Sequence, residues 1–214
     1  MNKNIIFSDL EGTILRDRDN SYSDEDMFNF LQIINNFNKV TNAIPEIHLV
    51  SPVGGAFMDK CINKIDKNIS SFNSITHSRL PFIHSAYCSE NNDIDVKLSS
   101  NIIIAKAPTS SNYNSWKSMY VQDICDSMTS NTPNNTINFI YLGNGQNDLR
   151  SMEIVKRFKG VVICPQNSDS KVKLLSDFIG KSDDLRGITD GLNQYVKTLI
   201  PPHSIDDQDT IIEK

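Results

Sequence analysis

Short apolar runs alternate with longer amphipathic stretches along most of this chain, and this alternation limits the possible folds more than any other feature. Residues 2–8, 47–50, 137–142 and 160–164 have the length and apolar character of buried strands. Strands that alternate with helices are typical of a parallel sheet with helices on both faces. We therefore predict an α/β fold, a three-layer Rossmann-like parallel sheet.

The stretches between these runs have features of helices. Ser23 is a suitable N-cap, and the three acidic residues after it favour a helix that begins at Asp24. Apolar residues recur at helical spacing in this helix, and Pro45 is expected to end the unit. Further helices are expected over 57–69, 116–128, 149–158 and 170–179, and strand-like pieces over 80–86 and 102–105.

Charge and hydropathy exclude several classes of partner. The 214 residues include 21 basic and 26 acidic ones, a net charge of −5, which argues against a nucleic-acid-binding protein. No apolar run approaches the roughly 18–20 residues of a membrane span, so no membrane association is expected. The apolar stretch near the N-terminus is too short for a signal peptide, and a cytoplasmic location is expected. The sequence leaves the oligomeric state open.

The cysteines are too widely spaced for a zinc knuckle or a redox motif. They are expected to be reduced thiols, and Cys164 to be a small buried residue within an apolar run. The four are Cys61, Cys88, Cys125 and Cys164.

Polar residues follow the predicted strands at the sheet edge where ligands bind in such folds. Asp9 and Glu11 come directly after the first strand, and Gly12 allows a tight turn. Paired carboxylates can divide the work of catalysis, one attacking or binding a metal while the other transfers protons. Taken alone, an acidic turn without a catalytic role is an equally good interpretation.

Two further strand ends carry suitable side chains. Ser51 could donate a hydrogen bond to a phosphate oxygen, or could simply cap the following helix. Asn144 and Asp148 follow the strand 137–142. Together with Asp9 they could supply oxygen ligands to a hard cation, although Asp148 could also be a plain helix cap.

These segments resemble the motifs of the haloacid-dehalogenase-like (HAD) hydrolase superfamily. Residues 6–15 (IFSDLEGTIL) resemble its first motif, 49–51 (LVS) its second and 142–152 (LGNGQNDLRSM) its fourth. Lys117 lies 26 residues before Gly143 and fits the third motif, with Lys106 as the alternative. Residues 160–168 resemble a strand and Asn-rich loop of the family, and 186–192 resemble the C-terminal signature of its Cof-type, sugar-phosphatase-like branch. The resemblance covers roughly residues 1–55 and 110–200.

The resemblance implies a role for each matched residue. Asp9 would be the nucleophile that forms an aspartyl-phosphate, and Glu11 the general acid and then the base. The transferred phosphoryl group would be held by Ser51, Lys117, Gly12 and Thr13. The implied cofactor is Mg²⁺, with the ligands Asp9, Glu11 (through its backbone carbonyl), Asn144 and Asp148.

Two residues depart from the common family pattern. Glu11 stands where most of the family's phosphatases have Asp, which keeps the acid but lengthens it by one methylene. Asn144 stands where the family normally has Asp, and it removes one negative charge from the implied metal site. We therefore expect weaker magnesium binding, with Asp148 as possible compensation.

The expected domain organisation is a core with a small insertion. The core covers 1–69 and 110–200, a reduced α+β or irregular cap covers 70–109, and a polar tail covers 201–214. Only about 40 residues remain for a cap between Ser51 and Lys117, which predicts a relatively open site. His77, Arg79 and His84 lie in the expected cap and could touch a substrate, although a position on the surface or in the cap core is the plainer interpretation of each.

The resemblance implies a Mg-dependent phosphomonoester hydrolase, a phosphatase of small phosphorylated metabolites, sugar phosphates among them. The alternative is a catalytically weak or inactive HAD-like module that binds a phosphorylated ligand or a protein partner, which Asn144 and the small cap favour. Metal-independent dehalogenases of the superfamily also attack with Asp, but they lack the acid two residues later, so Glu11 argues against them.

Overall fold

A computed structural model describes residues 2–16, 18–89, 102–105, 113–131 and 136–201. In these residues seven strands form one sheet in the order β4-β3-β2-β1-β5-β6-β7, and every neighbouring pair is parallel. The predicted α/β class, a Rossmann-like parallel sheet between helical layers, is confirmed.

The strands and helices follow one another in a simple alternation along most of the chain. The strands are β1 (Lys3–Ser8), β2 (Ile44–Gly54), β3 (Ser85–Ser89), β4 (Ile102–Ala105), β5 (Ile137–Leu142), β6 (Val161–Cys164) and β7 (Phe178–Ile179). The helices are α1 (Asp24–Thr41), α2 (Gly55–Thr76), α3 (Tyr113–Asn131), α4 (Leu149–Arg157), α5 (Ser170–Leu175) and α6 (Asp184–Thr198), with a 3₁₀ turn, η1, at Gln146–Asp148.

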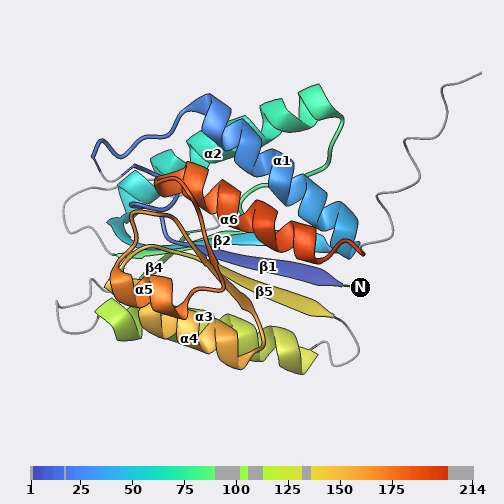
Figure 1. Cartoon of the computed structure of the whole chain (residues 1–214). Helices are drawn as coiled ribbons and strands as arrows, with labels where there is room; N and C mark the ends of the chain where they lie inside the picture. The colour runs from blue at the N-terminus through green and yellow to red at the C-terminus, as the bar shows by residue number, and fades with distance from the viewer. Residues whose placement is uncertain (1, 17, 90–101, 106–112, 132–135, 202–214) are drawn as a thin grey trace, which may run out of the picture.

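The two faces of the sheet are covered by different helices. Helices α1, α2 and α6 lie on one face, and α3, α4 and α5 lie on the other (Figure 1). Side chains of β1 divide between two apolar cores, Ile6 with the first layer and Ile5 and Phe7 with the second. Because both faces are buried, the middle of the strand, Ile5–Phe7, is a continuous apolar run instead of alternating with polar residues.

Helix α1 forms as the sequence predicts. The Ser23 hydroxyl accepts a hydrogen bond from the Asp26 amide, and three acidic residues occupy the first turn. Helix α1 buries the face that carries Met27, Phe30 and Ile34, so both cap and periodicity are confirmed.

Other expected boundaries are wrong. Pro45 lies inside β2 instead of before it. Strand β3 pairs with β2 from His48 onward, so β3 does not pair with β2 at Pro45. A proline without an N–H is tolerated there. The expected helix over 170–179 ends at Leu175, and Phe178–Ile179 adds β7 to the edge of the sheet. Helix α6 was not predicted as a helix.

The described part of the expected cap belongs to the core. Residues 70–76 complete α2, while β3 and β4 extend the main sheet beyond β2. The prediction of a separate insertion over 70–109 is therefore wrong for these residues, because β3 pairs with β2 in the main sheet. The rest of that segment, 90–101 and 106–109, lies outside the described residues, as does the tail after Pro201.

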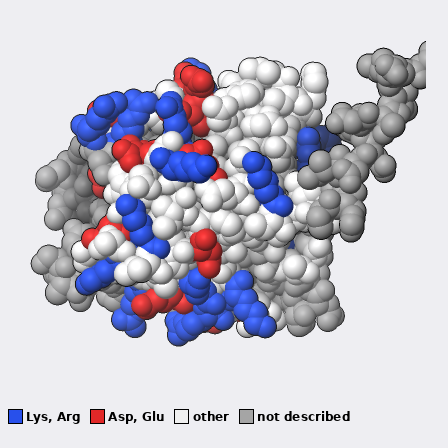
Figure 2. Space-filling model, viewed as in Figure 1, with Lys and Arg blue, Asp and Glu red and all other residues white. Residues whose placement is uncertain are grey.

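On the face shown in Figure 2, Lys and Arg side chains lie beside Asp and Glu side chains. Among the described residues, no helix combines the length and apolar character needed to cross a membrane. All four cysteines are buried, and the expectation for Cys164 is confirmed.

Candidate functional site

The candidate site begins where β1 ends. Asp9 directly follows Ser8 and is 3% exposed. Its amide donates to the Leu142 carbonyl (3.0 Å), which ties this residue to the end of β5. Its Oδ1 atom accepts a hydrogen bond from the Leu10 amide (2.8 Å). The backbone therefore fixes Asp9 at the carboxyl edge of the sheet, where ligands bind in parallel α/β folds.

A tight turn follows Asp9. Gly12 has a φ of 68°, a conformation that a side chain would disfavour, and its amide donates to the Leu15 carbonyl (2.7 Å). The Thr13 amide donates to the Leu10 carbonyl (3.3 Å) within the same turn. Glu11 is exposed on this turn, whereas Thr13 is buried.

Helix α3 brings a lysine to Asp9. The Lys117 Nζ atom lies 2.9 Å from Asp9 Oδ1 and 2.8 Å from Asp148 Oδ1, and the side chain is fully buried. Burial alone would lower the pKa of Lys117, but the two carboxylates outweigh it and raise the pKa. The lysine is therefore a fixed cation at the strand ends. Lys106, the alternative to Lys117, lies outside the described residues.

Asp148 is surrounded by hydrogen-bond donors. Its Oδ1 atom accepts from Lys117 and from the Tyr141 hydroxyl, both at 2.8 Å. Its Oδ2 atom accepts from the amides of Asn144 and Gly145, both at 3.1 Å. With four donors and no exposed surface, this carboxylate positions Lys117 and the loop after β5.

Tyr141 is a site residue that the sequence reasoning missed. It lies one residue before the end of an apolar strand, where an aromatic side chain is indistinguishable from an ordinary core residue. Burial and the neighbouring carboxylates raise the pKa of Tyr141 well above its usual value, so its hydroxyl remains a donor to Asp148.

Asp9 keeps one carboxylate oxygen free for chemistry. No hydrogen bond reaches Oδ2 from the described residues, in contrast to Oδ1. Burial and the negative charge of Asp148 raise the pKa of Asp9 to about 6, although Lys117 opposes this shift. A buried carboxylate next to a shared ammonium is a typical arrangement of a reactive site.

Asn144 lies across from the turn that follows Asp9. Its side-chain oxygen accepts a hydrogen bond from the Thr13 hydroxyl (3.3 Å). Its backbone carbonyl accepts from the Asp169 amide (3.0 Å). Two hydrogen bonds of Asn144 therefore connect the loop after β5 to its neighbours. The side chain connects it to the turn after β1, and the backbone carbonyl connects it to the start of α5.

Ser51 is a buried polar residue on β2. Ser8 of β1 pairs with Leu49 of β2. Ser51 is two residues beyond Leu49, as Asp9 is one residue beyond Ser8, so the two side chains lie at the same edge of the sheet. The Ser51 hydroxyl is fully buried and makes no hydrogen bond within the described residues. A buried hydroxyl without a partner costs stability and is suited to a ligand oxygen.

The donor set fits a hard divalent cation. Asp9 Oδ2 and the Asn144 amide oxygen belong to the oxygen ligands that Mg²⁺ accepts. The sequence placed Asp148 among these ligands, but its four hydrogen bonds leave it better suited to a supporting role. Magnesium would therefore have one carboxylate ligand in this set instead of two.

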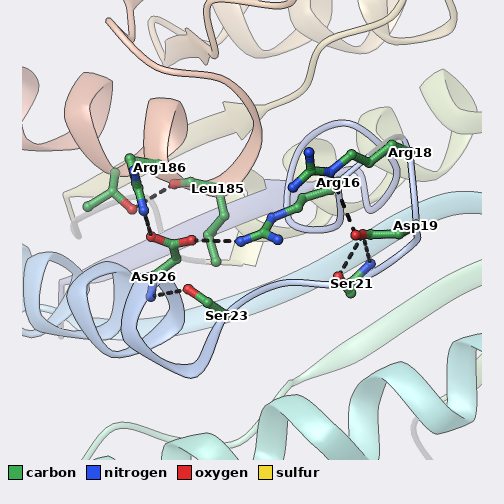
Figure 3. Close-up of polar contacts among 9 residues, drawn as sticks. Arg16, Arg18, Asp19, Ser21, Ser23, Asp26, Leu185 and Arg186 are labelled. Atoms are coloured by element: carbon green, nitrogen blue, oxygen red, sulfur yellow. Dashed lines mark hydrogen bonds and ion pairs between the residues drawn. The ribbon is translucent and has the colours of Figure 1, made fainter.

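A second polar cluster lies beside this edge. The Asp26 carboxylate accepts hydrogen bonds from Arg186 (3.0 and 3.1 Å) and from Arg16 (3.5 Å), as Figure 3 shows. These groups border a hollow of about 380 Å³ that Arg18, Asp183 and Asp184 also line. Because the arginines are paired with carboxylates, the cluster joins the segment after β1 to α1 and α6.

Comparisons with known proteins give a likeness in fold only. No family model and no curated protein matches the chain. One similar solved structure is the cobalt-bound deoxy-D-mannose-octulosonate 8-phosphate phosphatase of Haemophilus influenzae (10% identity, 92% of this chain and 89% of that chain covered, TM-score 0.48). Another is a haloacid dehalogenase-like hydrolase protein of Bacillus subtilis (14%, 91% and 89%, 0.48). The third is the 3-deoxy-D-manno-octulosonate 8-phosphate phosphatase of Yersinia pestis (8%, 92% and 82%, 0.49). At such values the likeness assigns neither activity nor substrate, which must be inferred from the chain's own residues.

Proposed function

We propose that this protein is a Mg²⁺-dependent phosphomonoester hydrolase that acts on a small phosphorylated metabolite, such as a sugar phosphate, in the cytoplasm. The observation that carries this proposal is the buried Lys117 ammonium, 2.9 Å from Asp9, whose second carboxylate oxygen accepts no hydrogen bond from the described residues. A cation beside a buried carboxylate suits the transfer of a negatively charged phosphoryl group.

The first half of the reaction forms a covalent intermediate on Asp9. Asp9 Oδ2 attacks the phosphorus atom, a new oxygen–phosphorus bond forms, and the bond to the leaving oxygen breaks. Glu11, exposed on the turn after β1, donates a proton to that leaving oxygen. The products of this half are the free alcohol and an aspartyl-phosphate.

The second half restores the enzyme. Glu11, now ionised, takes a proton from water, and the water oxygen attacks the phosphorus atom. The bond between phosphorus and Asp9 breaks, and inorganic phosphate leaves. Lys117 remains protonated throughout, because its two carboxylate neighbours raise its pKa.

The phosphoryl oxygens need donors that the fold does not already use. Ser51 has such a donor, since its buried hydroxyl has no partner in the described residues. Gly12 and Thr13 were expected to bind the phosphate, but their amides donate within the turn. We therefore propose that Gly12 and Thr13 shape the turn, and that Ser51 and Lys117 contact the phosphoryl group.

Asp9, the Glu11 carbonyl and Asn144 would hold the magnesium ion. When bound, the ion would offset negative charge on the phosphoryl oxygens and on Asp9. Asp148 would act through Lys117 and the loop amides, consistent with the four hydrogen bonds it accepts.

Hydrolysis of a generic aryl phosphate tests the proposal. We expect turnover with Mg²⁺, loss of turnover with a chelator, and loss in the Asp9→Asn variant. Asp126→Asn is the matched control, since Asp126 is an exposed carboxylate on the same helix as Lys117. Equal turnover in Asp9→Asn and in the wild type would overturn the proposed nucleophile.

One observation favours a second candidate function, that of a module which binds a phosphorylated ligand with little or no turnover. Asn144 offers a neutral amide where a second carboxylate would bind Mg²⁺ more tightly, and its oxygen already accepts from Thr13. The Asn144→Asp variant separates the two functions. A gain of about tenfold or more in magnesium affinity and rate would indicate an enzyme that is weakened at the metal.

A further inference from the structure

A second group of potential metal ligands lies away from the strand ends. Glu46 and His48 are two residues apart on β2, so their side chains point to the same face of the sheet. His84 precedes β3, and its amide donates to the Ile47 carbonyl (2.9 Å), which places it beside them. Each residue offers one ligand atom, and the three atoms all lie within 4.8 Å of one another.

Two of these atoms are buried and lack hydrogen-bond partners. Glu46 Oε2 and His48 Nε2 make no hydrogen bond within the described residues. They lie 3.8 Å apart, which is too far for a hydrogen bond between them. The His48 side chain is only 1% exposed, so solvent does not satisfy its Nε2 atom. Unpaired buried polar atoms that face each other need an explanation, and a bound ion provides one.

The other ring nitrogen of His48 is held in place. His48 Nδ1 lies 2.8 Å from the Ser85 hydroxyl and 3.1 Å from the Tyr120 hydroxyl. The two hydroxyl oxygens are themselves 2.6 Å apart. When Nδ1–H donates to one of them, Nε2 carries the free lone pair. This is the arrangement by which outer residues fix the tautomer of a metal-binding histidine.

The spacing suits an ion of the zinc class. Two ligands at about 2.0–2.1 Å from one tetrahedral ion are about 3.4 Å apart. Glu46 Oε2 is 3.8 Å from His48 Nε2 and 3.9 Å from His84 Nε2, so side-chain shifts of about 0.5 Å would bring these atoms to that spacing. The His84 side chain is 52% exposed, so it is free to turn toward the ion and keeps the site open to solvent.

We propose that Glu46, His48 and His84 form a binding site for a divalent transition-metal ion of the zinc class, with a fourth position open to water. Two imidazoles and one carboxylate are typical of such ions, whereas magnesium prefers oxygen ligands. Lys3 pairs with the other carboxylate oxygen, Oε1, and so leaves Oε2 for the ion. The site is independent of the proposed hydrolase activity and shares none of its residues.

Zinc titration of the full chain, with excess Mg²⁺ present to occupy the Asp9 site, tests this proposal. The readout is the ¹⁵N signal of the ring nitrogens, which separates all four histidines of the chain. We expect Zn²⁺ to shift the Nε2 signals of His48 and His84 and to raise the melting temperature, because the ion binds the folded state.

Variants distinguish the site from adventitious binding. His84→Gln, at an exposed position, is expected to fold normally and to lower zinc affinity by more than about tenfold. Ser85→Ala removes the hydroxyl beside His48 Nδ1 and is expected to lower it by about tenfold. His77→Asn is the control, because Asn tolerates the left-handed conformation found at His77 (φ 52°). Unshifted rings of His48 and His84, or equal zinc affinity in His84→Gln and wild type, would overturn the proposal.

Discussion

The Lys117 ammonium is fully buried between two carboxylates, and no other side chain of the described residues forms ion pairs with both Asp9 and Asp148. Replacing it with Met would leave two buried carboxylates without a cation. We expect Lys117→Met to lower the free energy of unfolding by about 3–5 kcal/mol and to abolish turnover. Urea unfolding measures the first effect, and the aryl phosphate assay measures the second. A variant as stable as the wild type would show that the carboxylates do not depend on the lysine.

A milder substitution, at Tyr141, tests the supporting role of Asp148. Tyr141→Phe removes one of the four donors to this carboxylate and leaves the ring in place. We expect a loss of about 1–3 kcal/mol in unfolding free energy, the range for a buried hydrogen bond to a charged group. Tyr195→Phe is the control, because the Tyr195 hydroxyl makes no hydrogen bond in the described residues. Equal losses in the two variants would contradict the assigned role.

Asp9 should titrate at an unusual pH in the metal-free protein. Burial and Asp148 raise its pKa from 3.8 to about 6, so the folded state holds a proton that the unfolded state releases. The stability from this proton is complete below pH 3.8 and is lost as the pH rises through about 6. The ¹³C signal of the Asp9 carboxyl group reports the pKa directly. A midpoint near the usual aspartate value would contradict this.

At the scale of elements, Asp26 joins α1 to α6 and to the segment after β1 through Arg186 and Arg16. Burial would raise the pKa of Asp26, but hydrogen bonds from Ser23 and Arg186 outweigh it, and the pKa falls below 3.8. The stabilising effect of its ionised form is therefore present above pH 3.8 and is lost as the pH falls through the lower folded-state pKa.

We expect Asp26→Asn to be less stable than the wild type at neutral pH, with the difference shrinking in acid. Thermal unfolding of both proteins between neutral pH and pH 3 measures it. Asp190→Asn is a suitable control, since Asp190 lies on α6 and, within the described residues, accepts a hydrogen bond from Ser182 and forms no ion pair. A difference between wild type and Asp26→Asn that does not change with pH would contradict the ion-pair role.

Local signals predicted some elements well and others poorly. The start of α1 was predictable because Ser23 and the acidic first turn act within a few residues. Helix α6 was missed, although it buries Leu185, Ile188 and Leu192 at helical spacing. The assignment of β3 and β4 to a cap failed for another reason. Their place in the sheet depends on pairing with β2, and such long-range pairing leaves no mark on the local sequence.

At the scale of the whole molecule, the parallel sheet explains why residues far apart in the chain meet in the candidate site. Asp9 and Asn144 follow β1 and β5, and Ser51 lies near the carboxyl end of β2, so all three lie at one edge of the sheet. The separate roles of the side chains at this edge could not be predicted. Whether Asp148 binds a metal or a lysine depends on where α3 lies against β5, which only the packed structure shows.

The measurement that tests the central claim most directly is the detection of a phosphoryl group on Asp9. The protein is mixed with an aryl phosphate and Mg²⁺, and the reaction is quenched in acid. The protein is then digested, and mass spectrometry measures the mass of the peptide that contains Asp9. We predict that this peptide gains the mass of one phosphoryl group, more abundantly in Glu11→Gln, which lacks the base for the second half, and not in Asp9→Asn. Turnover with no label on this peptide, or with the label on another residue such as Ser51, would contradict the account.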